Sequence, residues 1–244
     1  MLGRAFERLH SGPVDTTLWG LPVRLYPDGN VSEKKALLNP ARFNRFELDA
    51  ITARLQLRGS VFVDIGANAG LFSLYVAGRA APETTIIGVE PHPELFRRMR
   101  FNLGAKAAGV DLRLLPIGVG ASSGDAVLHS DDHELGSGSI VDGAGTTDGI
   151  RVPMRRLADV LTEQGVDGID VMKIDVEGYE DRVLQPFFET APPALWPRAV
   201  VIEHLSRGDW QWDCIGEAAA LGYRLRKLSK SNTLLELSAG EEGQ

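Results

Sequence analysis

The sequence has little cysteine, no long hydrophobic run and no excess of positive charge. Its one cysteine, Cys214, cannot form a disulfide within the chain or build a thiolate metal cluster. No apolar run approaches the roughly 20 residues that a membrane-spanning helix needs. Near the start, Arg4, Glu7 and Arg8 interrupt the stretch where a signal peptide would be apolar. We therefore expect a cytoplasmic protein without a membrane span.

The charge balance argues against a nucleic-acid partner. The formal net charge is −7, whereas a broad nucleic-acid surface needs clustered excess lysine and arginine. With 43% hydrophobic residues and 24% charged residues, the composition is that of an ordinary globular protein. We expect a small-molecule substrate, and the sequence leaves the oligomeric state open.

Short apolar strands alternate with helices from residue 61 onwards. Strands are expected at 61–63, 84–89, 112–119, 169–174 and 199–203, and helices at 71–80, 93–103, 157–164, 179–190 and 213–221. This alternation predicts an α/β fold with a doubly wound, mostly parallel sheet. The two last strands, 223–228 and 233–237, have hairpin spacing and should be antiparallel.

Two segments depart from this rhythm. Residues 1–60 form a prelude in which we expect a short strand near residues 23–26 and a helix over 43–55. Residues 61–240 form the ligand-binding domain, interrupted at 120–149 by an insertion with seven glycines. We expect a hairpin or mobile loop there, and its acidic stretch 131–134 is a candidate lid over the substrate.

The strongest local motif covers residues 61–70 (VFVDIGANAG). It places Asp64 at the end of a buried strand and follows it with a tight turn containing Gly66 and Gly70. In a parallel sheet the ligand lies outside the carboxyl ends of the strands. Glycine lets a bulky cofactor approach the backbone because it has no Cβ atom. The motif therefore predicts a nucleotide-like ligand, although a tight strand–helix connection without any ligand would look similar.

A second carboxylate, Glu90, ends the next strand and suits a bidentate hydrogen bond to two ribose hydroxyls. A nicotinamide cofactor would require the middle glycine of a G-x-G-x-x-G turn to admit its pyrophosphate. Asn68 occupies that position here. S-adenosylmethionine has ribose hydroxyls and no pyrophosphate, so this pattern favours the methyl donor. The alternatives are a nicotinamide-dependent oxidoreductase and a non-catalytic cofactor-binding module.

A third motif, residues 172–180 (MKIDVEGYE), places several acids at the end of the fourth strand. Asp175 and Glu177 would face the ligand crevice there. The alternative is structural, because Asp175 could cap the next helix, with Glu177 and Glu180 favourable in its first turn.

Together the three segments resemble the FkbM family of methyltransferases, over roughly residues 45–205. The resemblance implies a class I methyltransferase (Rossmann-like) fold with a seven-stranded sheet and an antiparallel C-terminal hairpin. It also implies S-adenosylmethionine as cofactor and methyl transfer, commonly to a hydroxyl on a sugar, polyketide or other small metabolite. It carries over as cofactor contacts Asp64, Gly66, Asn68, Gly70 and Glu90, with Pro91 beside them, and as crevice residues Asp175 and Glu177.

An alcohol becomes a good nucleophile only when its proton leaves, so a general base is expected. The candidates are Asp175 and His204, and His204 follows Glu203 at the end of the fifth strand. Glu203 is expected to line the crevice. His204 has the pKa range of a base at neutral pH, although it could equally hydrogen-bond locally. Asp175, Glu177, Glu203 and His204 could together supply oxygen and nitrogen ligands to a metal. Sulfonium chemistry does not demand one, and we assign no metal.

Overall fold

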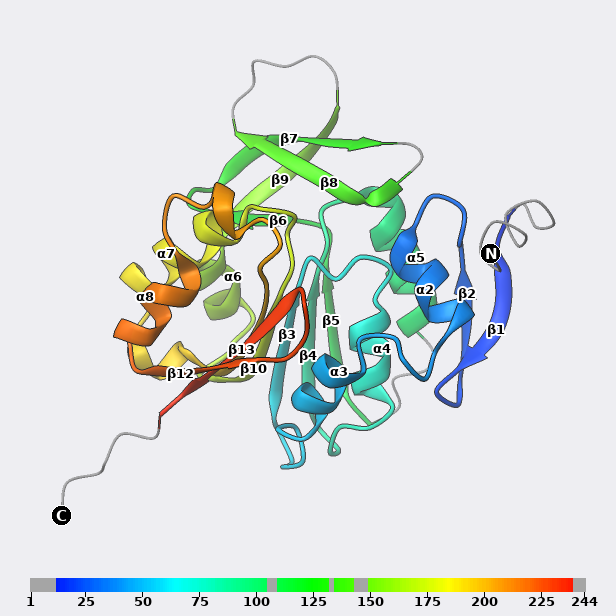
Figure 1. Ribbon diagram of the computed structural model, residues 1–244, viewed down its shortest axis with the longest axis horizontal. Helices are drawn as coiled ribbons and strands as arrows, with labels where there is room; N and C mark the ends of the chain where they lie inside the picture. Colours follow the sequence, from blue (N-terminus) through cyan, green and yellow to red (C-terminus); the bar gives the residue numbers. More distant parts are fainter. Residues whose placement is uncertain (1–11, 105–108, 132–133, 143–148, 239–244) are drawn as a thin grey trace.

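A seven-stranded sheet runs through the middle of the molecule, with helices on both of its faces (Figure 1). The structure, a computed structural model, describes residues 12–104, 109–131, 134–142 and 149–238. The sheet order is β12-β13-β11-β10-β3-β4-β5. These strands are β3 (Val61–Ile65), β4 (Thr85–Val89), β5 (Asp111–Leu115), β10 (Ile169–Ile174), β11 (Pro197–Glu203), β12 (Tyr223–Lys227) and β13 (Asn232–Leu237).

The five strands from β11 to β5 are parallel, whereas β13 runs antiparallel to both β11 and β12. The predicted doubly wound sheet with seven strands and an antiparallel C-terminal hairpin is therefore confirmed. The strands read as continuous apolar runs because both faces of the sheet are buried. Along β3, for example, Phe62 packs with Ile51 and Val76 on one face, and Val63 belongs to the core that contains Leu184 on the other.

The helices divide between these two faces. One face is covered by α3 (Arg45–Thr52), α4 (Leu71–Ala77) and α5 (Pro93–Leu103), and the other by α6 (Leu157–Glu163), α7 (Glu180–Thr190) and α8 (Cys214–Ala220). Two short 3-10 helices, Pro193–Leu195 and Arg207–Asp209, complete the connections. Within the described ranges, no helix is both long and apolar enough to cross a membrane.

The strand predicted over 112–119 is divided in two. β5 ends at Leu115, and Pro116 separates it from β6 (Gly118–Gly120), which belongs to a second sheet. Proline has no backbone N–H to donate to a sheet ladder, so the chain leaves the large sheet there. The second sheet has the order β6-β9-β7-β8, with β7 (Gly124–Asp131), β8 (Glu134–Asp142) and β9 (Ile150–Arg156).

This second sheet contains the described part of the glycine-rich insertion. It lies above the large sheet at the top of the view (Figure 1). β7 and β8 pair as an antiparallel hairpin. Asp132 and His133, in the middle of the acidic stretch, lie outside the described residues, as does the segment 143–148.

The prelude contains more structure than the sequence indicated. β1 (Val14–Leu18) and β2 (Leu21–Leu25) form a hairpin, and α2 (Val31–Leu38) follows it before the expected α3. The side chain of Asn30 caps α2 by accepting a hydrogen bond from the backbone N–H of Glu33. The Asn-x-x-Glu spacing is a helix-start signal, and α2 begins there although no helix was expected in this segment.

Candidate active site

A cavity of about 410 Å³ lies at the carboxyl ends of β3, β4 and β10. The turns after these strands form its floor, and the start of α2, the β12–β13 turn and strand β8 contribute the remaining walls. Carboxylates come to this space from three strand ends: Glu90 after β4, Asp175 and Glu177 after β10, and Glu203 at the end of β11. The cavity is therefore where the sheet topology would place a ligand.

The turn after β3 passes very close to the end of β10. Gly66 has a φ of +69°, and a Cβ atom on it would lie 1.9 Å from the carbonyl oxygen of Asp175. The backbone N–H groups of Gly66 and Ala67 both donate to the carbonyl of Val89, at 3.0 Å. Gly66 thus allows two strand ends to meet beneath the cavity, and its own backbone lines the cavity floor.

Glu90 joins this turn to the cavity wall. One of its carboxylate oxygens accepts from the backbone N–H of Asn68 at 2.7 Å, and the other accepts from the N–H of His92 at 2.8 Å. Burial raises the pKa of Glu90 to about 7, against the opposing effect of these two hydrogen bonds and of the Lys173 charge. The carboxylate is therefore fixed in place before any ligand arrives.

Lys173 is a buried cation beneath the floor. Its ammonium donates to the carbonyl of Gly66 at 2.7 Å and lies 3.6 Å from Asp64 and 3.7 Å from Asp175. Burial lowers the pKa of Lys173, but the charges of Asp175, Asp64 and Glu90 outweigh it and the pKa is raised. We did not predict a role for this residue, although a lysine inside an otherwise apolar buried strand is a sequence signal for one.

Asp175, Glu177 and Glu203 also line the cavity. Glu177 has a left-handed backbone, and burial together with the charges of Asp175 and Glu180 raises its pKa to about 7. Burial likewise raises the pKa of Glu203 to about 7, while the N–H of Leu205 donates to its carboxylate. Carboxyl groups that titrate near neutral pH can take up a proton from a substrate.

Asp175, Glu180 and Glu203 present oxygen atoms within 4.8 Å of one another. A cation could occupy such a space, but both oxygens of the buried Glu180 already accept hydrogen bonds. The donors are the N–H of Val176 at 2.8 Å and the indole of Trp210 at 2.9 Å. Through these bonds Glu180 stabilises the turn after β10. We assign no metal to the cluster.

The structure brings most, but not all, of the sequence-predicted residues to the cavity. Those on its walls are Gly66, Asn68, Glu90, Pro91, Asp175, Glu177 and Glu203. Among the described residues, Asp64, Gly70 and His204 are outside the lining. Asp64 is buried with Ser73 and Lys173, and Gly70 packs against Met99.

His204 is held by the turn that joins the last two strands. Its Nε2 lies 3.1 Å from the carbonyl of Lys230, and its Nδ1 lies 3.1 Å from the hydroxyl of Thr233. Burial lowers the pKa of His204. Both ring nitrogens of His204 therefore have local partners, and of the two predicted bases Asp175 is the one that lines the cavity.

Strand β8 forms the upper wall of the cavity. The predicted lid was the acidic stretch 131–134, and of that stretch Glu134 lines the cavity. The Glu134 carboxylate accepts from the N–H of Val31 at 2.9 Å, and the N–H of Leu135 donates to the carbonyl of Gly29 at 2.9 Å. Glu134 and the following residues to Gly138 line the cavity. The hairpin is thus tied to the start of α2.

Residues 64–224 match the family model described as the methyltransferase FkbM domain. Methyltransferase sdnD of Sordaria araneosa is 32% identical over 152 residues, which are 50% of this chain and 58% of that protein. The 31-O-demethyl-FK506 methyltransferase FkbM of Streptomyces tacrolimicus is 31% identical over 170 residues, 57% of this chain and 62% of that protein. The matched regions therefore span less than two thirds of these relatives. A solved methyltransferase from Geobacter sulfurreducens aligns over 85% of this chain and 87% of its own, with 12% identity and a TM-score of 0.48.

Proposed function

The chain belongs to the FkbM family of methyltransferases, and we propose that it transfers the methyl group of S-adenosylmethionine to a hydroxyl oxygen of a sugar, polyketide or other small metabolite. One observation carries the proposal: Glu90 and Asp175 reach the same cavity from the carboxyl ends of β4 and β10. The first suits a cofactor contact and the second suits a proton acceptor, so one cavity has the groups for both halves of the reaction.

The cavity fits the methyl donor in shape and in charge. Gly66 lets the turn after β3 form the floor against the end of β10, and the carboxylate of Glu90 can accept hydrogen bonds from the two ribose hydroxyls. The donor also carries a sulfonium and an amino group, both positive. Carboxylates outnumber lysines among the residues that line the cavity, which complements these charges.

Asp175 is the general base in this proposal. Methyl transfer is an in-line displacement, so much of the rate comes from holding the acceptor oxygen against the methyl group. A positioned base adds typically about 10²–10⁴-fold by removing the hydroxyl proton. Glu177 and Glu203, whose pKa values are raised to about 7, lie on the same wall to hold the acceptor hydroxyls.

A thermal-shift comparison of S-adenosylmethionine, S-adenosylhomocysteine and NAD tests the proposal. A ligand at 100 times its dissociation constant should stabilise the protein by about 2.7 kcal/mol. We expect both sulfur-containing ligands to raise the melting temperature and NAD to leave it unchanged. Stabilisation by NAD alone would show that the chain uses a different cofactor.

Substitutions at the two carboxylates should separate binding from chemistry. We expect Glu90→Ala to weaken S-adenosylhomocysteine binding about tenfold or more, because two ribose hydroxyls lose their acceptor. Asp175→Asn should change that affinity by less than about threefold and lower turnover by about 10²–10⁴-fold. Calorimetric binding and single-turnover methylation measure the two effects. An equal loss of affinity in both variants would remove Asp175 from the role of base.

Cofactor affinity should depend on pH through Glu90. Because its pKa is raised to about 7 by burial, a growing fraction carries a proton as the pH falls below 7. The ribose hydroxyls bind the carboxylate better than the acid, so affinity should fall by up to about tenfold per pH unit below 7. Titration calorimetry between pH 8 and pH 5.5 checks this. Glu90→Gln should bind weakly without that slope, whereas a retained slope would assign the titration to Glu177 or Glu203.

A further inference from the structure

We propose that Asn30 is a positioning residue for the cofactor: its side-chain amide holds Asn68, and through Asn68 the carboxylate of Glu90, in the ribose-binding geometry. This inference rests on the proposed use of S-adenosylmethionine. Asn30 lies in the prelude, just before α2, and nothing in the three motifs of the sequence includes it.

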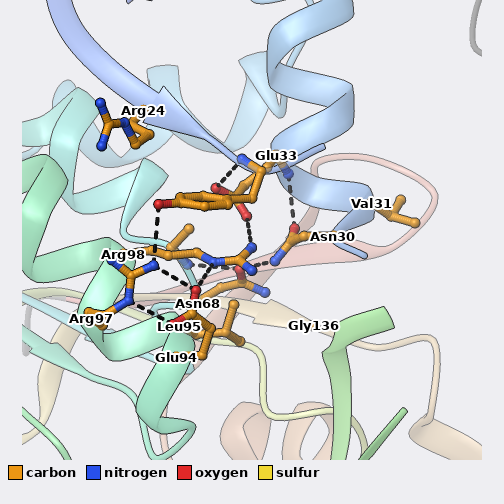
Figure 2. A network of polar contacts seen from close by, with 12 residues as sticks. Arg24, Asn30, Val31, Glu33, Asn68, Glu94, Leu95, Arg97, Arg98 and Gly136 are labelled. Carbon is orange, nitrogen blue, oxygen red and sulfur yellow. Dashed lines mark hydrogen bonds and ion pairs between the residues drawn. The ribbon is translucent and has the colours of Figure 1, made fainter. Parts of the chain in front are cut away.

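The contact between the two asparagines is direct and partly buried (Figure 2). The Asn30 amide nitrogen donates to the side-chain oxygen of Asn68 at 2.7 Å. Asn30, the donor, is 1% exposed, and shielding the donor from water strengthens and orients a hydrogen bond. The bond links the N-terminal segment to the turn after β3.

Asn68 connects Asn30 to Glu90. Its backbone is left-handed, with a φ of +54°, a conformation that asparagine tolerates better than most residues but still at some cost. Its side-chain oxygen also accepts from the N–H of Ala69 at 2.7 Å, and its own N–H donates to Glu90 at 2.7 Å. The same residue therefore receives the bond from Asn30 and orients the carboxylate of Glu90.

A positioning residue must itself be held in place, and Asn30 is held by the start of α2. Its side-chain oxygen caps α2 through the N–H of Glu33 at 3.0 Å. The Glu33 carboxylate, fully buried, accepts from Arg98 of α5 at 2.6 Å and from the N–H of Tyr26 at 3.1 Å (Figure 2). The start of α2 is thus anchored on the same helix that follows Glu90.

Strand β8 covers the pair of asparagines. A Cβ atom on Gly136 would lie 2.8 Å from the amide nitrogen of Asn68 and 3.7 Å from that of Asn30. Gly136 therefore lets the backbone of β8 approach the pair closely. The cofactor turn, α2 and the hairpin meet at Asn30.

Two substitutions of Asn30 keep the helix cap and remove the donor. Aspartate and serine are both good N-cap residues, so α2 should remain stable in Asn30→Asp and Asn30→Ser. Neither can donate to Asn68 as the amide does, because the carboxylate has no hydrogen and the serine side chain is too short. The serine variant is neutral, so it separates loss of the donor from the added charge of aspartate.

We expect both variants to bind S-adenosylhomocysteine about tenfold more weakly by calorimetry. The KM for S-adenosylmethionine should rise by a similar factor, with kcat at saturation within about twofold of wild type, because Asn30 does not touch the reacting atoms. In an Asn68→Ala background, Asn30→Ser should change the dissociation constant by less than about twofold, since its effect passes through Asn68.

The inference is wrong if wild-type protein binds S-adenosylhomocysteine and both Asn30 variants bind it within twofold; the proposed function then stands. It is also wrong if Asn30→Ser weakens binding equally with and without Asn68→Ala, or if kcat falls while KM is unchanged. Failure of the wild-type protein to bind S-adenosylhomocysteine at all would overturn the proposed function and this inference together.

Discussion

Gly66→Ala should lower the free energy of unfolding by about 3 kcal/mol or more and abolish cofactor binding. A left-handed backbone costs a residue with a Cβ about 1–2 kcal/mol, and overpacking typically adds about 1–3 kcal/mol. The Cβ would lie 1.9 Å from the carbonyl oxygen and 2.9 Å from the carbonyl carbon of Asp175. Both atoms belong to the backbone, so no side-chain rotation relieves the contact. The turn after β3 and the end of β10 must separate, which deforms the cavity floor.

Gly165→Ala is the matched control. Gly165 has a φ of +64°, close to the +69° of Gly66, but nothing lies within 4 Å of its added Cβ. The free energy of unfolding of this variant should therefore fall by only about 1–2 kcal/mol, the cost of a left-handed backbone. Its binding of S-adenosylhomocysteine should be normal. Urea denaturation and calorimetry measure both variants. Equal destabilisation of the two would mean that the floor yields easily and that the close approach does not matter.

Lys173→Met should destabilise the protein by about 3–5 kcal/mol, the usual result when one partner of a buried ion pair is removed. Methionine has a similar length and apolar stem, so packing changes little. The loss comes from the Asp64 carboxylate, which is fully buried and would be left without the ammonium that lies 3.6 Å away. The carbonyl of Gly66 would also lose its donor. Urea denaturation at pH 7 gives the free energy of unfolding.

Adding Asp64→Asn to Lys173→Met should recover a large part of this stability, because the second change removes the uncompensated charge. The amide retains an oxygen that can accept from the Ser73 hydroxyl, now 2.7 Å from the Asp64 carboxylate. Asp64→Asn alone serves as the reference for the cycle. If Lys173→Met costs less than about 1 kcal/mol, or if the double variant is no better than the single one, the ion pair does not stabilise the floor.

The large sheet could be predicted because its strands carry their own signals. The 169–174 strand and the 93–103 helix have the bounds expected from the sequence. The first is an apolar run bounded by turn residues, and the second begins with a proline in its first turn, which fits a helix start. The prediction of a single strand over 112–119 was wrong because apolar residues continue past Pro116 into a different sheet. Apolar character alone does not show to which sheet a residue belongs.

The sequence could predict that the site lies at the ends of the strands, but not which side chains reach the cavity. Glu90 follows the last residue of β4 and lies on the cavity wall, whereas Asp64 is still inside β3 and is buried. Asp64 pairs with Gly88, two positions before Glu90, so both side chains are on the same face and only Glu90 lies beyond the strand end. The surroundings of His204 depend on Lys230 and Thr233, which reach it only through the pairing of β11 with β13.

The hydrogen bond between Glu134 and Val31 limits which β7–β8 hairpins from related proteins could replace the one in this chain. The two residues are 103 positions apart in the chain, yet the carboxylate of one caps the helix that the other begins. A foreign β7–β8 hairpin without a carboxylate at position 134 would leave the N–H of Val31 without this acceptor. Gly29 and Val31 contribute only backbone atoms to these contacts, so a hairpin graft meant to change the methyl acceptor must bring its own carboxylate at position 134.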